Sequence, residues 1–192
     1  MEDQLGLFGA PPASAFPSGF KYAPDLITRD AERALLAHIR ELPFKEFEFH
    51  GYLGKRRVVS YGWRYDYAER RVHQAADMPG FLIPLRERAA AFAGLAADKL
   101  QQALVTEYDV GAPIGWHRDK PEFGAIVGVS LLAACTFRLR RKVGETWERF
   151  SIVAEPRSAY LMSGAVRTEW EHSIPPVSAL RYSVTFRTVG EL

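Results

Sequence analysis

The tripeptide His117-Arg118-Asp119 is the first candidate for chemistry in this sequence. In an extended segment, residues two apart project to the same side, so the imidazole of His117 and the carboxylate of Asp119 can share one metal ion. Together they supply two of the three ligands of a facial triad that binds iron(II). The alternative interpretation is a solvated turn after Gly111-Ala112-Pro113, because His-x-Asp tripeptides also arise by chance.

The third ligand must be a distant histidine, and His172 is the best candidate. It precedes Ser-Ile-Pro-Pro, a turn signal close to the last predicted strands. His38 falls within a predicted helix and is expected at the surface. His50 and His73 lie in a basic, aromatic segment, and neither has a carboxylate two residues downstream.

A strand predicted at residues 181–188 alternates polar and apolar side chains. Its apolar face suits a core, and its polar face places Ser183 and Thr185 between Arg181 and Arg187. The six-residue step along the strand from Arg181 to Arg187 spans about 20 Å. Each arginine side chain can reach inward by roughly 6 Å, so the two guanidinium groups can bracket a gap of about 7–8 Å. That gap suits a short dicarboxylate such as 2-oxoglutarate. The alternative is an edge strand whose arginines face solvent.

Two helices and a series of short strands must position these residues. A first helix is predicted at about 28–42, capped by Thr28, and a second from Pro84 towards Gln102. Short strands after residue 103 predict an α+β protein with a jelly-roll-like barrel. They are expected at 103–108, 125–131, 136–140, 149–153, 158–162 and 181–188.

The segment between the helices, at about 44–76, is predicted to form strands and loops. Residues 51–72 contain six basic residues and only two acidic ones, with five aromatic residues interleaved among them. Basic groups for phosphate and aromatic faces for stacking are what nucleic-acid binding requires. The alternative is a half-buried hairpin with solvated arginines. The candidate substrate contacts here are Trp63 and Tyr65, which could stack on a base, with Tyr61 and Arg64 beside them.

Composition places the chain among ordinary globular proteins. It has 192 residues, 47% of them hydrophobic, and a net charge of +2, which is too weak to indicate a partner. A single cysteine excludes an intrachain disulfide and fits a reducing cytoplasm. We expect a cytoplasmic monomer without a signal peptide or a membrane span. Residues 1–18 are predicted to be a flexible tail and linker, and residues 19–192 a single domain with its barrel at about 103–190.

Several motifs, taken in order, resemble the AlkB family of iron(II)- and 2-oxoglutarate-dependent dioxygenases. The similarity covers roughly residues 105–188 and is weaker before them. A single motif would be unspecific, whereas the ordered set is specific. The motifs are residues 108–124 (YDVGAPIGWHRDKPEFG), 129–131 (VSL), 170–172 (WEH) and 181–187 (RYSVTFR).

The resemblance implies a double-stranded β-helix, with a nucleotide-recognition lid at about 44–76, and O2 as the oxidant. It implies iron ligands at His117, Asp119 and His172. It assigns Arg181 to the distal carboxylate of 2-oxoglutarate and Arg187 to the keto-acid end. Tyr108 matches a tyrosine that hydrogen-bonds the cosubstrate, and Ser183 replaces a common asparagine beside it.

The resemblance also implies a reaction, the oxidative demethylation of N-alkylated bases in DNA, which releases succinate, CO2 and formaldehyde. One departure bears on the substrate. Many base-repairing members carry a carboxylate two residues after the metal aspartate, where this chain has Pro121, and Glu122 is the candidate replacement. RNA, tRNA or protein substrates therefore stay open, as does a non-catalytic nucleic-acid-binding module.

The N-terminal tail suggests a partner. Gln4-Leu5-Gly6-Leu7-Phe8 resembles the short peptide with which bacterial repair and replication proteins dock onto the sliding clamp. Leucines and a phenylalanine on a disordered tether suit an apolar pocket. The alternative is a tail that folds back onto its own core.

Overall fold

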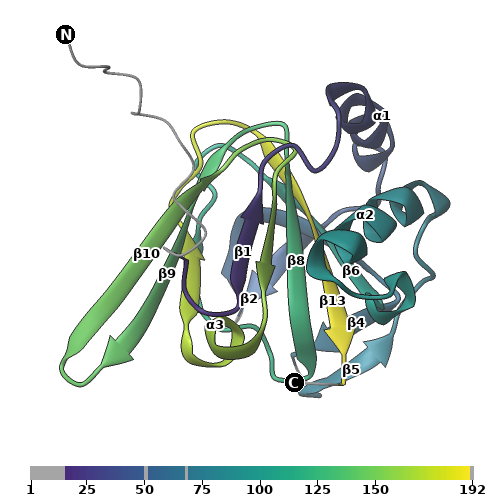
Figure 1. The fold of residues 1–192 in the computed structure, drawn as a ribbon. Coiled ribbons are helices and arrows are strands. Elements are labelled where there is room, and N and C mark those ends of the chain that lie inside the picture. Colours follow the sequence, from purple (N-terminus) through teal and green to yellow (C-terminus); the bar gives the residue numbers. More distant parts are fainter. Residues whose placement is uncertain (1–15, 50–51, 68, 191–192) are drawn as a thin grey trace, which may run out of the picture.

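Two antiparallel sheets face each other in the computed structural model, which describes residues 16–49, 52–67 and 69–190 (Figure 1). A cluster of buried side chains fills the space between the sheets. Phe20, Ile126 and Tyr160 enter it from the larger sheet, and Phe137 and Leu139 from the smaller one. The predicted jelly-roll barrel is confirmed. The predicted clamp-docking segment, residues 4–8, lies outside the described residues.

The larger sheet has the strand order β1-β11-β8-β13-β6-β3-β2. Because β13 lies between β8 and β6, its residues are buried on both faces. The alternative interpretation, an edge strand whose arginines face solvent, is therefore wrong. The strands are β1 (Phe20–Ala23), β2 (Lys45–Phe49), β3 (Tyr52–Tyr61), β6 (Gln102–Tyr108), β8 (Phe123–Leu131), β11 (Ala159–Met162) and β13 (Arg181–Val189).

The smaller sheet has the order β10-β9-β12-β7. Its strands are β7 (Ile114–His117), β9 (Cys135–Val143), β10 (Thr146–Ala154) and β12 (Glu171–Ile174). The strand pattern of the sequence indicates β9 and β10 but not β12. This four-residue strand is followed by two prolines, and its pairing with β7 and β9 is what makes it a strand.

Two helices cover the outer face of the larger sheet. Helix α1 (Arg29–Ile39) begins after Thr28, whose hydroxyl accepts a hydrogen bond from the backbone N–H of Ala31 at 3.2 Å. Both helices bury apolar side chains against Val105, Val127 and Val184 of the sheet.

Helix α2 (Ile83–Ala93) ends much earlier than the sequence predicts. Gly94 follows it with φ +72, the left-handed conformation that glycine adopts without a steric penalty. The backbone N–H of Leu95 then bonds the carbonyl of Ala90 and closes the helix. The remaining helical elements are the short turns η2 (Gly80–Leu82) and η3 (Ala97–Lys99) and a short helix, α3 (Gly164–Glu169). No helix among the described residues is long and apolar enough to cross a bilayer.

The predicted lid segment divides into two parts. Residues 56–61 of β3 pair with β6, so this part belongs to the larger sheet. A separate hairpin follows, formed by β4 (Trp63–Asp66) and β5 (Arg71–Gln74). Gly62 joins the two parts at φ +72, where a Cβ atom would lie 2.0 Å from the carbonyl oxygen of Gln101. Only glycine allows the chain to turn so close to β6.

Candidate metal centre and cosubstrate site

The three predicted metal ligands meet at one point in the structure. His117 ends β7, and His172 lies beside it in β12, in direct register. The two imidazole ring centroids are 4.2 Å apart. The potential ligand atoms of His117, Asp119 and His172 all lie within 4.8 Å of one another. One imidazole–imidazole–carboxylate set around a single point matches the facial triad expected for iron(II).

The neighbours of each histidine prepare it to bind a cation. Nδ1 of His117 lies 2.9 Å from the carbonyl oxygen of Gly115, so Nδ1 carries the hydrogen and the lone pair of Nε2 faces Asp119. His172 is 8% exposed and stacks on Phe137 with 5.5 Å between ring centroids. Burial, reinforced by the nearby His117, lowers the pKa of His172 to about 3, which keeps its ring neutral.

Asp119 is held ionised by the groups around it. Burial alone would raise its pKa, but the charge of Arg187 and the nearby His117 and His172 outweigh burial and hold the pKa well below its usual range. One carboxylate oxygen, Oδ1, lies 3.6 Å from Nε2 of His117. The other, Oδ2, accepts a hydrogen bond from Nε of Arg187 at 3.2 Å. Asp119 therefore offers one oxygen to a metal while its second oxygen is anchored.

Arg187 is already occupied by protein partners. Besides Asp119, it donates from Nη1 to the amide oxygen of Gln102 at 3.0 Å, and its guanidinium lies 5.3 Å from the ring centroid of Phe123. The resemblance assigns Arg187 to the keto-acid end of the cosubstrate. The structure places it at the metal end of β13, bonded to a metal ligand.

Arg181, at the other end of β13, is only 1% exposed and has unused donors. Nη2 donates to Ser130 Oγ at 3.0 Å, and the guanidinium lies 4.7 Å from the ring centroid of Tyr108. Among the described residues, nothing accepts a hydrogen bond from Nε or Nη1. A buried cation with unsatisfied donors is costly, and a carboxylate ligand would supply both a counter-charge and hydrogen-bond acceptors. This feature fits the distal carboxylate of 2-oxoglutarate.

Polar residues of β13, β6 and β3 surround Arg181. The hydroxyl groups of Tyr108 and Ser183 are 3.3 Å apart and buried. Strand register places Arg56 of β3 beside Tyr108, which in turn lies beside Arg181. Burial lowers the pKa of Arg56, while the nearby Tyr108, Tyr67 and Asp119 raise it, so this arginine faces the same site. Sequence reasoning missed the roles of Arg56 and Ser130, which only register reveals.

The β4–β5 hairpin reaches the metal site through its aromatic residues. Lys120 directly follows the metal ligand Asp119, and its ammonium group lies 5.0 Å from the ring centroid of Tyr65 and 5.4 Å from that of Tyr67. The two tyrosine rings meet edge to face at 5.2 Å. Tyr67 was not among the predicted substrate contacts, although its position in the aromatic segment could have indicated it.

The other predicted substrate contacts occupy different environments. Trp63 is half-buried and lies on the same face of β4 as Tyr65, whereas Arg64 is exposed on the opposite face. Glu122 is half-buried, and its Oε2 atom is enclosed without a hydrogen-bond partner among the described residues. Tyr61 is 8% exposed and belongs to the core between the larger sheet and the helices. Its ring is already packed, so the prediction of a substrate contact for Tyr61 is wrong.

Helix α3 holds the loop that follows Asp119. Arg167 is 5% exposed and donates to the backbone carbonyl oxygens of Lys120, Phe123 (2.6 Å) and Gly124 (3.1 Å). Because one guanidinium donates to three backbone carbonyl oxygens, it holds the loop beside the metal ligand in one conformation. No sequence signal marked Arg167, because its partners lie more than forty residues away in the chain.

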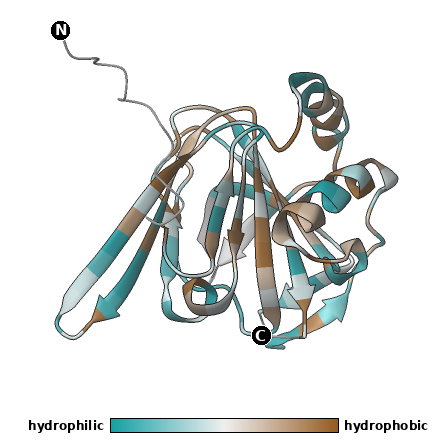
Figure 2. Cartoon of the chain, in the orientation of Figure 1, coloured by the Kyte–Doolittle hydropathy of each residue, from teal (hydrophilic) through white to brown (hydrophobic). Residues whose placement is uncertain are grey.

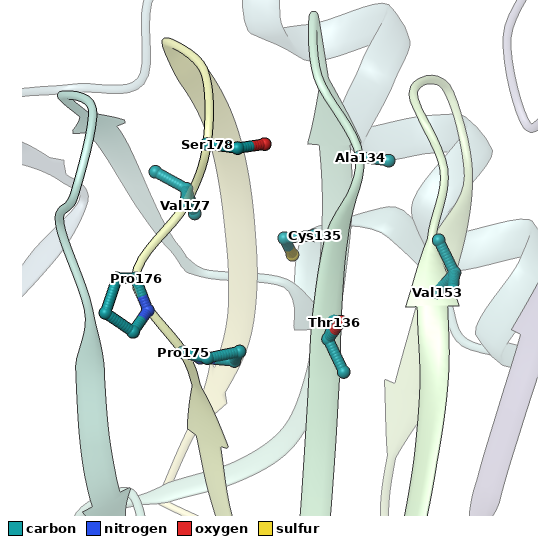
Figure 3. A pocket seen from close by; sticks show the side chains of 8 residues that line it. All are labelled: Ala134, Cys135, Thr136, Val153, Pro175, Pro176, Val177 and Ser178. Atoms are coloured by element: carbon teal, nitrogen blue, oxygen red, sulfur yellow. The ribbon is translucent and has the colours of Figure 1, made fainter.

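A separate cavity of about 200 Å³ opens between the start of β9 and the loop before β13 (Figure 3). Cys135, Val153, Pro175 and Val177 are among the residues that line it. Burial raises the pKa of the Cys135 thiol, and the nearby charge of Arg181 opposes this shift. None of the three candidate metal ligands lines this cavity.

Comparisons with known proteins agree with this geometry. Residues 20–187 match the family model of the 2OG-Fe(II) oxygenase superfamily. The chain is 30% identical over 181 residues to the Alkylated DNA repair protein ALKBH8 homolog of Arabidopsis thaliana, covering 82% of this chain and 51% of that protein. It thus spans about half the length of the Arabidopsis relative. It is 26% identical to the Uncharacterized protein L905 of Acanthamoeba polyphaga mimivirus, covering 90% and 85% of the two chains.

Solved structures share the fold at low sequence identity. The structure of OsALKBH1 has a TM-score of 0.65 and 16% identity, and the match covers 90% of this chain and 98% of the other. A 2OG-Fe(II) oxygenase family oxidoreductase from Burkholderia pseudomallei has a TM-score of 0.61 and 15% identity, covering 89% and 85%. The family match, the convergent triad and the buried, unsatisfied Arg181 lead to one conclusion. This chain belongs to the 2OG-Fe(II) oxygenase superfamily, whose members use iron(II), 2-oxoglutarate and O2, and within it the chain is similar to the ALKBH8 and ALKBH1 proteins named above.

Proposed function

We propose that this protein oxidatively removes small alkyl groups from nitrogen atoms of nucleic-acid bases, with alkylated DNA as its substrate. The observation that carries the proposal is the position of Tyr65 and Tyr67, which meet Lys120 immediately beside the metal ligand Asp119. Aromatic rings and a cation at the entrance of a metal site suit a flat base with its phosphate backbone. The similarity to the Arabidopsis protein, which is named an alkylated DNA repair protein, supports DNA as the substrate class.

The metal and the cosubstrate fit the residues that the site offers. His117, Asp119 and His172 would hold iron(II), and Arg181 would anchor the distal carboxylate of 2-oxoglutarate. When bound, these groups supply the oxidising power that converts an N-methyl group, 2-oxoglutarate and O2 into an N-hydroxymethyl group, succinate and CO2. Loss of formaldehyde, with the hydroxyl proton passing to the solvent or the ring nitrogen, leaves the repaired base.

The protein's own contribution is positioning and electrostatics. Arg187 keeps Asp119 ionised and fixes its orientation, while Gly115 fixes the tautomer of His117. The target base must leave its stack to reach the metal. Tyr65 would stack on the extruded base, and the ammonium group of Lys120 would bind its phosphate.

One assay tests the proposal directly. The protein is incubated with iron(II), ascorbate, 2-oxoglutarate and oligonucleotides that carry 1-methyladenine or 3-methylcytosine, and succinate, formaldehyde and the repaired base are measured. We expect formaldehyde and repaired base in equal amounts, together with the same amount of succinate once the succinate formed without an oligonucleotide is subtracted. Succinate without repaired DNA, under conditions where an alkylated RNA is repaired, would contradict DNA as the substrate.

Two variants separate the chemistry from recognition. Asp119→Ala should lower turnover by more than about 100-fold, the upper end for changes around a metal ligand, and should weaken iron binding. Tyr65→Ala should weaken oligonucleotide affinity about fivefold or more, because one base–aromatic stack is lost, while substrate-independent consumption of 2-oxoglutarate stays unchanged. Equal affinity of Tyr65→Ala and the wild type would exclude Tyr65 as the stacking residue. Tyr22→Ala, which removes a half-buried tyrosine from β1 at the opposite edge of the larger sheet, is the matched control.

A second candidate is the same chemistry on RNA or another substrate. It rests on position 121, where a proline stands in place of the carboxylate common in base-repairing relatives, with Glu122 half-buried next to it. Glu122→Gln should change the preference between 1-methyladenine and 3-methylcytosine if this carboxylate contacts the base. The same ratio of the two activities in both proteins would exclude that contact.

A further inference from the structure

The outer face of the smaller sheet carries a stack of alternating arginine and tryptophan side chains. The guanidinium of Arg140 lies between two indoles, 4.4 Å from the ring centroid of Trp116 and 4.3 Å from that of Trp147. The guanidinium of Arg138 also lies over Trp116, 5.0 Å from the ring centroid. We call Trp116, Arg138, Arg140 and Trp147 the outer ladder. It runs across strands β7, β9 and β10.

Strand alternation explains why these residues share a face. In β9, Phe137 and Leu139 point into the barrel, so Arg138, Arg140 and Lys142 point outward. Side-chain contacts with β12 hold two of the arginines in place. Arg140 Nε donates to a carboxylate oxygen of Glu171 at 2.7 Å, and Arg138 Nε donates to Ser173 Oγ at 3.0 Å. The rings and guanidinium planes are therefore ordered in advance of any ligand.

The charge of this face is strongly positive. Register places Arg149 of β10 directly beside Arg140 and Trp147 beside Lys142, on the same side of the sheet. Four cations, Arg138, Arg140, Lys142 and Arg149, thus share the face with the single carboxylate of Glu171. Lys142 and Arg149 are exposed and make no ion pair with any described residue. Figure 2 shows the hydrophilic character of much of the β9–β10 hairpin.

The face is open and adjoins the metal site. Helices α1 and α2 pack on the other sheet, and Figure 1 shows them on the opposite side of the molecule from β9 and β10. Trp147 remains 37% exposed. Trp116 immediately precedes the metal ligand His117, so neighbouring residues of β7 serve the interior site and the outer ladder. A chain that enters the metal site can continue around this edge onto the outer face.

We propose that the outer ladder and its flanking cations bind single-stranded nucleic acid next to the base held at the metal site. The inference rests on the proposed function. Exposed indole edges and guanidinium planes offer stacking surfaces for bases, and Lys142 and Arg149 offer charge to phosphates. Strand β9, with nine residues, extends about 30 Å, which accommodates several nucleotides. The positive charge favours a polyanion as the occupant.

The test compares oligonucleotides of two lengths. A methylated trinucleotide fills the metal site alone, whereas a 16-nucleotide strand with the same central lesion also reaches the outer face. Affinity and repair rate are measured for both with the wild type, Trp147→Ala and the double variant Lys142→Glu/Arg149→Glu. The matched control is Arg29→Glu/Arg88→Glu, which makes the same charge change at exposed positions on α1 and α2. Thermal unfolding confirms that each variant is folded.

We expect the Lys142→Glu/Arg149→Glu variant to bind the long strand at least about tenfold more weakly at low salt, with a flatter dependence of affinity on salt. Trp147→Ala should lose about fivefold. Both variants should bind and repair the trinucleotide within about twofold of the wild type, and the control should behave as the wild type throughout.

The outcomes distinguish this inference from the proposed function. If Trp147→Ala and Lys142→Glu/Arg149→Glu both bind the long strand as tightly as the wild type and still repair it, the outer-face inference alone is overturned. The outer ladder would then stabilise the sheet or bind an acidic protein. A wild type that neither binds nor repairs any methylated oligonucleotide would overturn both proposals. Equal weakening of the trinucleotide would also contradict the inference, because the changes would then act on the metal site.

Discussion

Arg181 and Arg187 lie on the same face of strand β13 but differ in how many of their hydrogen-bond donors have an acceptor in the protein. Arg187 donates to Asp119 and Gln102, both fixed parts of the protein. Arg181 donates to Ser130 and keeps two enclosed nitrogen atoms without an acceptor among the described residues. An arginine that is already satisfied serves structure and electrostatics. One left unsatisfied in a buried site indicates a ligand.

Replacing Arg181 should produce the largest difference between the two ends. Arg181→Met removes the charge and keeps a similar shape, so we expect the KM for 2-oxoglutarate to rise about 30-fold or more, the value of a charge-assisted two-point contact. The free energy of unfolding without cosubstrate should rise by about 1 kcal/mol, because an unpaired buried charge has been removed. Steady-state kinetics and chemical denaturation measure the two effects. A destabilised Arg181→Met protein with an unchanged KM would show that Arg181 is structural.

Arg187→Met should have the opposite effect on stability. Its removal leaves the buried carboxylate of Asp119 without its main counter-charge, so the free energy of unfolding should fall by about 3 kcal/mol. Iron affinity should fall about tenfold, because the carboxylate loses the group that orients it. Denaturation and iron titration of the same preparation are the measurements. If Arg187→Met is as stable as the wild type, the ion pair does not organise the metal end.

A pH titration of stability should report on the metal end only. The pKa of His172 is about 3 in the folded protein, because burial and the nearby His117 lower it, and its usual value is 6.5. Between these values the unfolded chain binds a proton that the folded protein does not, so stability falls as the pH decreases below about 6.5. At pH 5.5 the loss should be about 1 kcal/mol for the metal-free protein. Asp119 contributes only below its usual value of 3.8, since its folded pKa is lower still.

His172→Gln is the control for this titration. The variant has no imidazole at position 172, so its stability should depend less on pH between 6.5 and 4.5. The same slope in the variant and the wild type would assign the dependence to another group. Arg181→Met should retain the wild-type slope, because Arg181 does not titrate in this range.

Local patterns predicted those parts of the fold that depend on neighbours in the chain. Thr28 caps the first helix as its residue type indicates, and strict alternation in residues 181–188 identified both faces of β13. The second helix is shorter than the sequence predicts, because Gly94 adopts the left-handed conformation that ends it. The basic and aromatic residues around Tyr61 predict that it contacts the substrate. The pairing of β3 with β6 instead places Tyr61 in the core.

Residue types and their spacing identify the candidate ligands, which are His117, Asp119 and His172, and they place two arginines on one face of one strand. These follow from residue type and from the two-residue period of an extended chain. The folded chain alone reveals that β7 and β12 lie in register, that Arg187 is bonded to Asp119, and that Arg181 keeps two donors without an acceptor among the described residues. The reason is physical, because strand register and the burial of a charge are set by residues that are distant in the chain and close only after folding.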